Sequence, residues 1–336
     1  MNEYGDISPR VGVKAAKKLL RVGLPQIVTQ RFGMTDDQPR NSGLIRKWRR
    51  YHSFADATAP LAEGVSPAGQ AIRYTDYTAT LQQYGDKVPL TDIIADNHED
   101  PVMDVMMMRC GEQFSQTIEA LTLSVLKGGT NVYYAGGVGG RSSVNSTITR
   151  GDIRKVVRGF DRAYASVISR IIPPNPNVST AGVLPSFFAL AHTDLEPDIR
   201  NITGFKSIAE YSNPNQAVPG ECGSVERVRF VLTPKLTSWE TSGASGTVYL
   251  SGGVAVNSAA SADVYPILFL ARDAYGIVRL QGRQAVKVMV LNPNTPRHGD
   301  ELGQQGAVSW KTQYACARLN EQWMARLEVG CTANPS

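Results

Sequence analysis

The sequence lacks any long hydrophobic run. Its 336 residues contain no stretch of about 18 apolar residues, so no segment is expected to span a membrane. The first residues, MNEYGDISPRVGVKAAKK, also lack the apolar centre and cleavage site of a secretory signal. Cysteines are few and form no CxxC pair: Cys110, Cys222, Cys316 and Cys331. These absences argue against a disulfide framework or a zinc site, and they predict buried free thiols in a protein made in the cytoplasm.

Catalytic motifs are missing as well. The four histidines form no HExxH or HxH pattern, and no GxSxG elbow occurs. Residues 134–142 (YAGGVGGRS) resemble a phosphate-binding loop, but Ala135 and Arg141 stand where that motif needs Gly and Lys. Polar and β-branched residues follow, whereas a phosphate loop opens directly into a helix. We therefore interpret residues 134–142 as a mobile loop.

Three groups of possible ligands have simpler interpretations. Residues 98–100 (HED) are adjacent at a helix start, so they cannot all face one ion, and capping and the helix dipole explain the two acids. His192, Asp194 and Asp198 could form a metal or acid–base site, yet Asp194 also suits the N-cap of the following helix. Cys222 has no partner histidine and is expected in a turn. The sequence thus predicts no enzyme, no cofactor and no metal site.

Positive charge is concentrated at the N-terminal end. Residues 1–50 contain eleven Lys/Arg and four Asp/Glu, a balance of +7, so the rest of the chain carries −2 of the net +5. Residues 1–43 also contain several Gly and Pro and little hydrophobic periodicity. This pattern predicts an extended arm that becomes ordered on a neighbour, or on nucleic acid. The alternative is a solubilising tail.

Two β-strands are predicted after the arm, at residues 44–53 (LIRKWRRYHS) and 71–85 (AIRYTDYTATLQQYG), with a loop rich in Pro, Gly and Ala between them. Both faces of this ribbon are polar, and a two-stranded ribbon is marginally stable alone, so it needs a surface to lie on. The basic, aromatic run at 46–52 could bind single-stranded nucleic acid. A contact with a neighbouring subunit is the competing interpretation.

The strongest pattern predicts a helix at residues 101–127. Asp100-Pro101 supplies an N-cap and an N1 proline, and Gly128-Gly129 supplies the stop. Apolar residues recur at spacings of three and four and predict one buried stripe: Val102, Val105, Met106, Cys110, Phe114, Ile118, Leu121 and Val125. The opposite face is expected to carry Arg109, Glu112, Gln116 and Glu119.

The rest of the chain mixes helices and strands. Thr149 and Asp152 form a capping pair for a second helix, whose apolar face is expected to reach Tyr164 and Ile168. A short helix is predicted within 195–211, and a Gly/Ser/Ala-rich stretch at 238–262 is interpreted as an inserted loop or hairpin. Strands are predicted at 182–192, 227–234, 265–272, 274–282 and 285–293, and two more within 307–330 that join near Asn320-Glu321. The fold class is α+β.

Eight short segments, taken in order, carry a resemblance: Arg46–Tyr51 (RKWRRY), Thr58–Val65 (TAPLAEGV), Gln83–Val88 (QYGDKV), Gly111–Gln113 (GEQ), Leu126–Gly137 (LKGGTNVYYAGG), Gly220–Gly223 (GECG), Val228–Val231 (VRFV) and Ala274–Gly276 (AYG). With the order of arm, ribbon, long helix, mixed centre and final strands, the sequence resembles the major capsid proteins of tailed bacteriophages, which have the Hong Kong 97-type fold. The similarity is greatest to the capsid family of the N-four-like podophages. The stretch at 238–262 matches no family pattern.

The resemblance implies five parts: an N-arm (1–45), an extended loop (46–92), a peripheral domain (93–149) with a spine helix at 101–127, an axial domain (150–281) and strands returning to the peripheral domain (282–336). It also implies self-assembly, as hexamers and pentamers, into an icosahedral virion shell around double-stranded DNA. The implied partners are a separate scaffolding protein, a portal, a decoration protein and packaged DNA, in a protein made in the bacterial cytoplasm. Contacts between subunits are expected at Arg46, Lys47, Trp48, Arg49, Arg50, Tyr51, Tyr74 and Tyr77.

Two alternatives remain open from the sequence. A nanocompartment shell protein of the same fold would enclose cargo enzymes in place of a genome. A basic nucleic-acid-binding protein would use the charged arm and the strand at 46–52.

Overall fold

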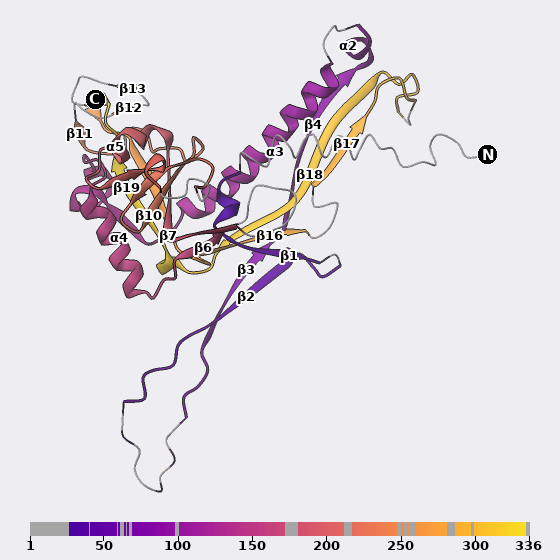
Figure 1. The fold of residues 1–336 in the computed structure, drawn as a ribbon. Helices are drawn as coiled ribbons and strands as arrows, with labels where there is room; N and C mark the ends of the chain where they lie inside the picture. The colour runs from indigo at the N-terminus through magenta and orange to yellow at the C-terminus, as the bar shows by residue number, and fades with distance from the viewer. Residues whose placement is uncertain are drawn as a thin grey trace.

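Two β-sheets organise the chain (Figure 1), and one hydrophobic core joins the first sheet to one face of the second, while another core covers the opposite face of the second sheet. The computed structural model describes residues 27–39, 41–58, 60, 64, 66, 69–97, 101–171, 181–211, 217–246, 250–251, 254–255, 260–280, 286–296 and 299–333. The first sheet has five strands in the order β1-β16-β18-β17, with β4 also paired to β18. Its strands are β1 (Met34–Gln38), β4 (Gln82–Thr91), β16 (Tyr275–Leu280), β17 (Val286–Leu291) and β18 (Gln305–Arg318).

The second sheet has eight strands in the order β5-β19-β15-β7-β10-β9-β8, with β6 also paired to β7. Its central strand β15 is buried along its whole length, as expected of a strand covered on both faces. The strands are β5 (Val132–Tyr134), β6 (Ile168–Ile171), β7 (Ala181–Ala191), β8 (Phe205–Ser207), β9 (Glu221–Val225), β10 (Val228–Leu232), β15 (Val264–Leu270) and β19 (Met324–Gly330). The predicted strands of this region are confirmed, but Cys222 lies inside β9 and not in a turn.

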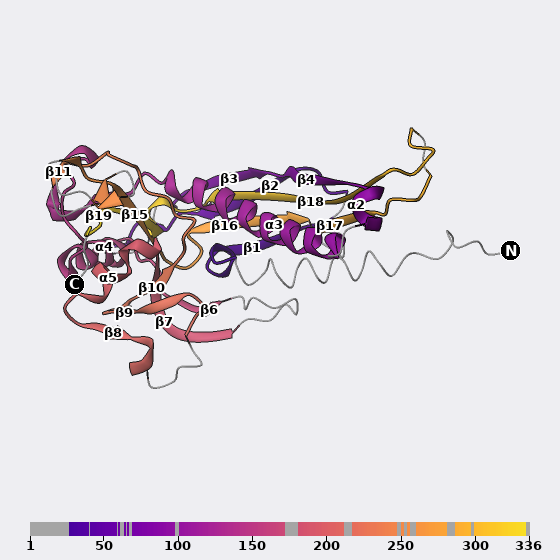
Figure 2. The ribbon, with the colours of Figure 1, turned by 90° about the horizontal axis from the view of Figure 1, so that it is seen from above.

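The long predicted helix is confirmed as α3 (Val102–Lys127), which runs along the five-stranded sheet (Figure 2). Pro101 occupies the N-cap and not the N1 position, and its carbonyl accepts the first helical hydrogen bonds. The ring of Phe114 meets that of Trp310 on β18 edge to face, with centroids 5.4 Å apart. The hydroxyl groups of Thr122 and Tyr314 are hydrogen-bonded to each other at 2.6 Å. Packing on one sheet therefore fixes the buried face of the helix.

That buried face is rotated from the predicted one. Cys110, Phe114 and Ile118 are buried as expected. The structure then buries Glu119, Thr122, Leu123 and Leu126, while Val102, Met106, Leu121 and Val125 are only half-buried and Val105 is exposed. The expectation that Glu119 faces solvent is wrong, because its carboxylate receives hydrogen bonds from the N-terminal segment.

The second predicted helix is α4 (Arg150–Arg162), and its capping pair is confirmed: the Thr149 hydroxyl accepts a hydrogen bond from the Asp152 N–H. Ile153, Val156 and Phe160 pack against the eight-stranded sheet. The helix is shorter than predicted. Tyr164 has a positive φ of 50° and is 90 % exposed, and Ile168 already begins β6. The left-handed backbone at Tyr164 ends the helical path.

The ribbon consists of β2 (Ile45–Tyr51) and β3 (Tyr74–Thr80), paired antiparallel; its base packs on the five-stranded sheet and its far end projects away from the body (Figure 1). The predicted strand at 71–85 is divided at Leu81. From residue 82 the chain continues as β4, which pairs with β18 over ten residues. The alternation of residue types along the sequence does not change at Leu81, but the paired strand changes from β2 to β18.

The segment before β2 belongs to the body of the subunit, in contrast to the predicted free arm. Ile27, Val28 and Phe32 are buried in the core beneath α3, and the rings of Phe32 and Phe188 lie 4.6 Å apart. Strand β1 pairs in parallel with β16. The N-terminal part of the arm, residues 1–26, lies outside the described residues.

Short elements complete the fold. The stretch at 238–262, interpreted as an inserted loop or hairpin, contains two small antiparallel pairs among its described residues, β11 (Ser245–Gly246) with β14 (Ala260–Ser261) and β12 (Leu250–Ser251) with β13 (Val254–Ala255). The remaining helices are α2 (Asp92–Asn97), α5 (Glu196–Arg200) and the 3-10 turns η2 (Thr29–Arg31), η3 (Ala135–Gly137), η4 (Arg141–Ser143), η5 (Thr193–Leu195), η6 (Ile208–Glu210) and η8 (Glu321–Trp323). None of the described helices is long and apolar enough to cross a membrane.

The two sheets do not follow the predicted boundary at 281/282. Strand β16, on the N-terminal side of that boundary, lies in the five-stranded sheet with β17 and β18. Strand β19, near the C-terminus, pairs with β15 and β5 in the eight-stranded sheet. The last two strands therefore separate at Asn320, and only β18 returns to α3.

Candidate assembly surface

The ribbon strand β2 presents two different faces to its surroundings. Its residues alternate between exposed and half-buried from Ile45 to Tyr51. Lys47 and Arg49 point to the exposed face, whereas Arg46, Trp48 and Arg50 are half-buried. This alternation follows from the two-residue period of a strand that lies on the body along one side. The predicted contact residues therefore divide into two groups.

Trp48 holds the base of the ribbon on its own subunit. Its indole packs against a small cluster formed by Ala79, Leu81, Val278 and Ala315. A Cβ at Gly276 of β16 would lie 2.8 Å from the indole Cζ2, so only a glycine lets the ring approach this closely. The side chain of Trp48 therefore makes an intramolecular contact, and its predicted contact with another subunit stays a prediction.

Two other half-buried residues also tie the ribbon to the body. The Arg46 guanidinium donates to Asp36 of β1 at 2.6 Å. The Arg50 guanidinium lies 5.4 Å from the ring of Trp323, in η8. The first contact joins the ribbon to a strand ten residues earlier and the second to a segment near the C-terminus, so together they fix the direction in which the ribbon leaves the body.

The exposed face carries a charged cluster. The Arg49 guanidinium donates two hydrogen bonds to Asp76, at 2.8 and 3.0 Å, and lies 4.1 Å from the centroid of the Tyr74 ring. Lys47 is 3.6 Å from the same carboxylate. The hydrogen bond from Arg49 lowers the pKa of Asp76. Because these groups are open to solvent, the cluster orients side chains more than it stabilises the fold.

Beyond the charged cluster the ribbon exposes a patch of large apolar side chains, here called the ribbon patch: Tyr51, Phe54, Ile72 and Tyr74. Tyr51 and Tyr74 are cross-strand partners with ring centroids 6.3 Å apart. Phe54 is 59 % and Ile72 67 % exposed. Grouped exposed apolar residues of this kind mark an interaction surface. The two tyrosines are among the residues predicted from the sequence to contact a neighbour; Phe54 and Ile72 are not, although two apolar residues beside the polar ends of the strands indicate an exposed apolar surface.

Tyr77, the remaining predicted contact residue, lies opposite Trp48 on β3 and is half-buried. The structure therefore brings together Arg49, Tyr51 and Tyr74, and separates them from Trp48 and Tyr77. Of the apolar residues predicted for the helix stripe, Cys110, Phe114 and Ile118 lie in the hydrophobic core on the buried face of α3.

The regions considered for chemistry have structural roles. Arg141, in the phosphate-loop-like run, makes a bidentate ion pair with the fully buried Glu328, at 2.7 and 2.8 Å. The run forms two 3-10 turns, and α4 begins only at Arg150. Burial raises the pKa of Cys222 to about 12. All four cysteines are free thiols.

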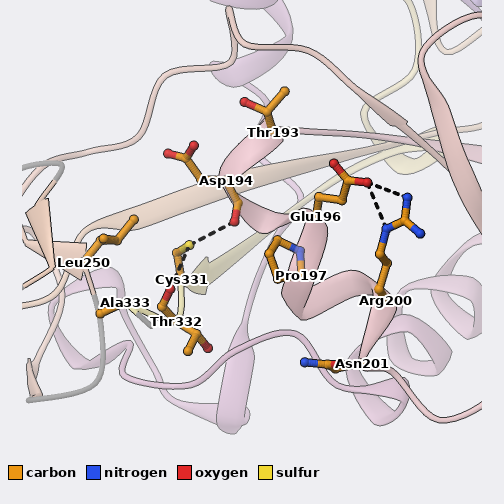
Figure 3. Close-up of a pocket in the computed structure, with 10 residues that line it drawn as sticks. All are labelled: Thr193, Asp194, Glu196, Pro197, Arg200, Asn201, Leu250, Cys331, Thr332 and Ala333. Atoms are coloured by element: carbon orange, nitrogen blue, oxygen red, sulfur yellow. Dashed lines mark hydrogen bonds and ion pairs between the residues drawn. The ribbon is translucent and has the colours of Figure 1, made fainter. Parts of the chain in front are cut away.

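A pocket between α5 and the C-terminal segment is lined by Asp194, one of the two predicted acidic residues, together with Glu196, Cys331 and Thr332 (Figure 3). His192, and not Asp194, is the N-cap of η5, because the His192 Nδ1 accepts a hydrogen bond from the Asp194 N–H at 3.1 Å. The Asp194 carboxylate accepts from Tyr265, and the Asp198 carboxylate accepts from the N–H and hydroxyl of Thr332. Within the described residues no group of three His, Cys, Asp or Glu could hold a metal ion. Residues 98–100 lie outside that part of the chain.

Comparison with known proteins identifies the class. A family model described as phage capsid protein matches residues 75–326, and the chain belongs to this family. Its fold is similar to the capsid of Ralstonia phage GP4, with a TM-score of 0.65, 12 % identity and 92 % of each chain covered. It is also similar to the capsid of cyanophage Pam1, with a TM-score of 0.61, 13 % identity and 92 % of each chain covered. No curated protein sequence matches the chain.

The protein is thus a bacteriophage major capsid protein, a structural component of the virion that assembles with itself into a shell. The predicted α+β fold of the Hong Kong 97 type is confirmed by the likeness to the solved capsids. The narrower resemblance to the N-four-like podophages stays a prediction.

Proposed function

We propose that the subunit assembles as hexamers and pentamers into the icosahedral shell that encloses the double-stranded DNA of a tailed phage. The observation that carries this proposal is the ribbon, whose base is packed on its own subunit while the ribbon patch is left exposed. A two-stranded ribbon is only marginally stable alone, and apolar side chains on its surface gain free energy when another surface covers them. A neighbouring subunit would provide that surface.

The residues of the ribbon then have different roles. Tyr51, Phe54, Ile72 and Tyr74 would contact the neighbour, with Lys47 and Arg49 at the polar rim. Arg46, Trp48 and Arg50 would hold the ribbon in position on its own subunit. Well-packed apolar contacts surrounded by charged groups are typical of protein interfaces.

Further partners follow from assembly into such a shell. A separate scaffolding protein would guide assembly in the cytoplasm of the host bacterium, a portal would occupy one vertex, and a decoration protein could bind outside. The basic N-terminal residues would make non-specific contacts with packaged DNA, because salt-dependent attraction to phosphate needs no base recognition. The subunit would have no cofactor and no contact with a membrane.

Self-assembly would be the only activity. We expect no hydrolysis of ATP or of peptides, because the polar groups that could form a site already bond to one another. Purified protein should release no phosphate from ATP above a buffer control. ATP turnover that is abolished by Arg141→Ala would contradict this proposal.

Negative-stain electron microscopy tests the assembly. The protein should form uniform closed shells when expressed alone or with a scaffolding protein. The double variant Phe54→Ser/Ile72→Ser should stay folded by circular dichroism but form few shells. The matched control is Tyr164→Asn, which removes another exposed aromatic ring at a left-handed position that asparagine tolerates. A persistent wild-type monomer that binds DNA tightly would contradict the proposal.

A further inference from the structure

A groove runs along the C-terminal half of α3, on the side away from the five-stranded sheet. It consists of two hollows that share Lys235, with volumes of about 320 and 580 Å³. The two hollows together are here called the α3 groove, and the larger one is lined by Ala120, Leu123, Ser124 and Lys127 of α3 and by Lys235, Leu236 and Trp239 of the segment after β10. Leu123 and Leu236 form an apolar floor, and Lys127 and Lys235 stand at its edges.

Positive charge behind the groove is only partly compensated. Three cations surround the Trp239 ring: the Lys127 ammonium at 4.1 Å, the Arg141 guanidinium at 3.6 Å and the Arg326 guanidinium at 5.4 Å from its centroid. One buried carboxylate, Glu328, serves both guanidinium groups. Desolvation and the two arginines lower the pKa of Lys127. An added negative charge at the groove would therefore be stabilised.

We propose that the α3 groove binds an acidic, amphipathic helical segment of a partner protein. Its carboxylates would meet Lys127 and Lys235, and its apolar side chains would fill the hollow against Leu236 and Trp239. The groove follows α3 from residue 116 to 128, a rise of about 18 Å, which accommodates roughly three turns of a second helix. The α3 groove lies apart from the ribbon patch, so this inference does not depend on the assembly proposal.

The lining favours a peptide over nucleic acid. Phosphate contacts with duplex DNA need accessible cations but no apolar cavity. Here, by contrast, the cations border a hollow with an apolar floor and an indole wall. The carboxylate at the end of the smaller hollow, Glu119, is compensated within the subunit by the N–H groups of Val28 and Thr29 and by the charge of Arg31. Acidic and apolar side chains on one helix face match this arrangement.

A labelled peptide tests the proposal on the full-length, unassembled subunit. The probe is an 18-residue peptide with leucines along one face and glutamates flanking it, followed by fluorescence anisotropy. A counterpart with lysine at every glutamate serves as the charge control. We expect saturable binding of the glutamate peptide only. Lys127→Glu/Lys235→Glu should weaken that binding at least tenfold, and Ala120→Phe, which fills the hollow without changing charge, should weaken it similarly.

Lys206→Glu is the matched control, since Lys206 is an exposed lysine on β8. If Lys206→Glu weakens binding as much as the double variant, the attraction is non-specific and the proposal is wrong. Binding that is unaffected by Ala120→Phe would also exclude the hollow. If duplex DNA displaces the peptide, and if the binding of DNA also requires Lys127 and Lys235, the groove is a nucleic-acid site instead. If sedimentation shows that the subunit self-associates and that Ala120→Phe abolishes this self-association, the groove binds a second subunit.

Discussion

Glu119 is the residue that most clearly couples distant parts of the subunit. It lies in α3 and is only 2 % exposed. Its carboxylate accepts hydrogen bonds from the N–H groups of Val28 and Thr29 at 3.2 and 3.1 Å and from the Thr29 hydroxyl at 2.7 Å. The carbonyl of Thr29 in turn accepts a hydrogen bond from the buried Tyr275 hydroxyl. One carboxylate therefore anchors the N-terminal segment between α3 and β16.

This anchor predicts a pH dependence of stability. Burial raises the pKa of Glu119 above its ordinary value of 4.5. As pH rises, the unfolded chain releases this proton first, so the free energy of unfolding should fall between pH 4.5 and the higher folded pKa. Glu119→Gln has no proton to release at this position, so its free energy of unfolding should not show this part of the decrease with pH. Urea unfolding of both proteins from pH 4 to 8 measures it, with Glu112→Gln, on the exposed side of α3, as the control. Parallel curves for wild type and Glu119→Gln would contradict the prediction.

At the scale of elements, α3 acts as the spine of the five-stranded sheet, and its buried face should dominate stability. Phe114→Ala removes a buried ring that contacts Trp310 and should lower the free energy of unfolding by about 3–5 kcal/mol. Leu121→Ala should cost less, about 2 kcal/mol or below, because that side chain is half-buried. Val105→Ala, a truncation at a 41 % exposed position of the same helix, is the control. Equal losses for Phe114→Ala and Val105→Ala in denaturant titrations would show that this face is not the core.

Trp48 is the aromatic anchor at the base of the ribbon, beside the contacts of Arg46 and Arg50. Trp48→Ala should release β2 and β3 from the five-stranded sheet and lower the free energy of unfolding by roughly 1–3 kcal/mol. Backbone amides of the ribbon should exchange hydrogen faster, while those of β15 should keep their protection. Tyr51→Ala, at an exposed position of the same strand, should leave exchange nearly unchanged. Unchanged exchange in Trp48→Ala would mean that the indole does not hold the ribbon.

At the scale of the whole molecule, the N-terminal region divides into two parts with different roles. Residues 1–26 carry five Lys/Arg and two acidic residues. Residues 27–38 supply buried side chains and strand β1. A protein without residues 1–26 should therefore fold normally but assemble poorly, with the defect greatest at low salt. Charges of this kind are screened beyond about 10 Å at 0.1 M salt. Light scattering against salt concentration measures assembly, and circular dichroism measures folding.

Deleting residues 1–40 should have a different effect. It removes Ile27, Val28 and Phe32 from the core and leaves β16 without its parallel neighbour β1. Each buried apolar side chain contributes about 1.5–3 kcal/mol, so this protein should fail to fold. If both truncations fold and assemble alike at every salt concentration, the basic residues are only a solubilising tail.

Local patterns in the sequence predicted much of the fold. The helix at 102–127 and the capping pair Thr149–Asp152 were found because spacing, caps and stop signals lie within a few residues of one another. The strands and the order of the elements were found in the same way. On the candidate site, composition identified a basic, aromatic ribbon strand, but it could not tell Trp48, which packs inward, from Phe54 and Ile72, which remain exposed.

The sequence by itself determined which segments are helices and strands and which lack the residues for chemistry, because these properties depend on neighbouring residues. Only the tertiary structure decided which sheet each strand joins, that Glu119 is buried, and that Lys127, Arg141 and Arg326 meet around Trp239. For Glu119 and for the three cations the partner lies about 90 residues or more away along the chain. Local periodicity carries no information about such a partner, and the contact forms only when the two sheets and α3 pack together.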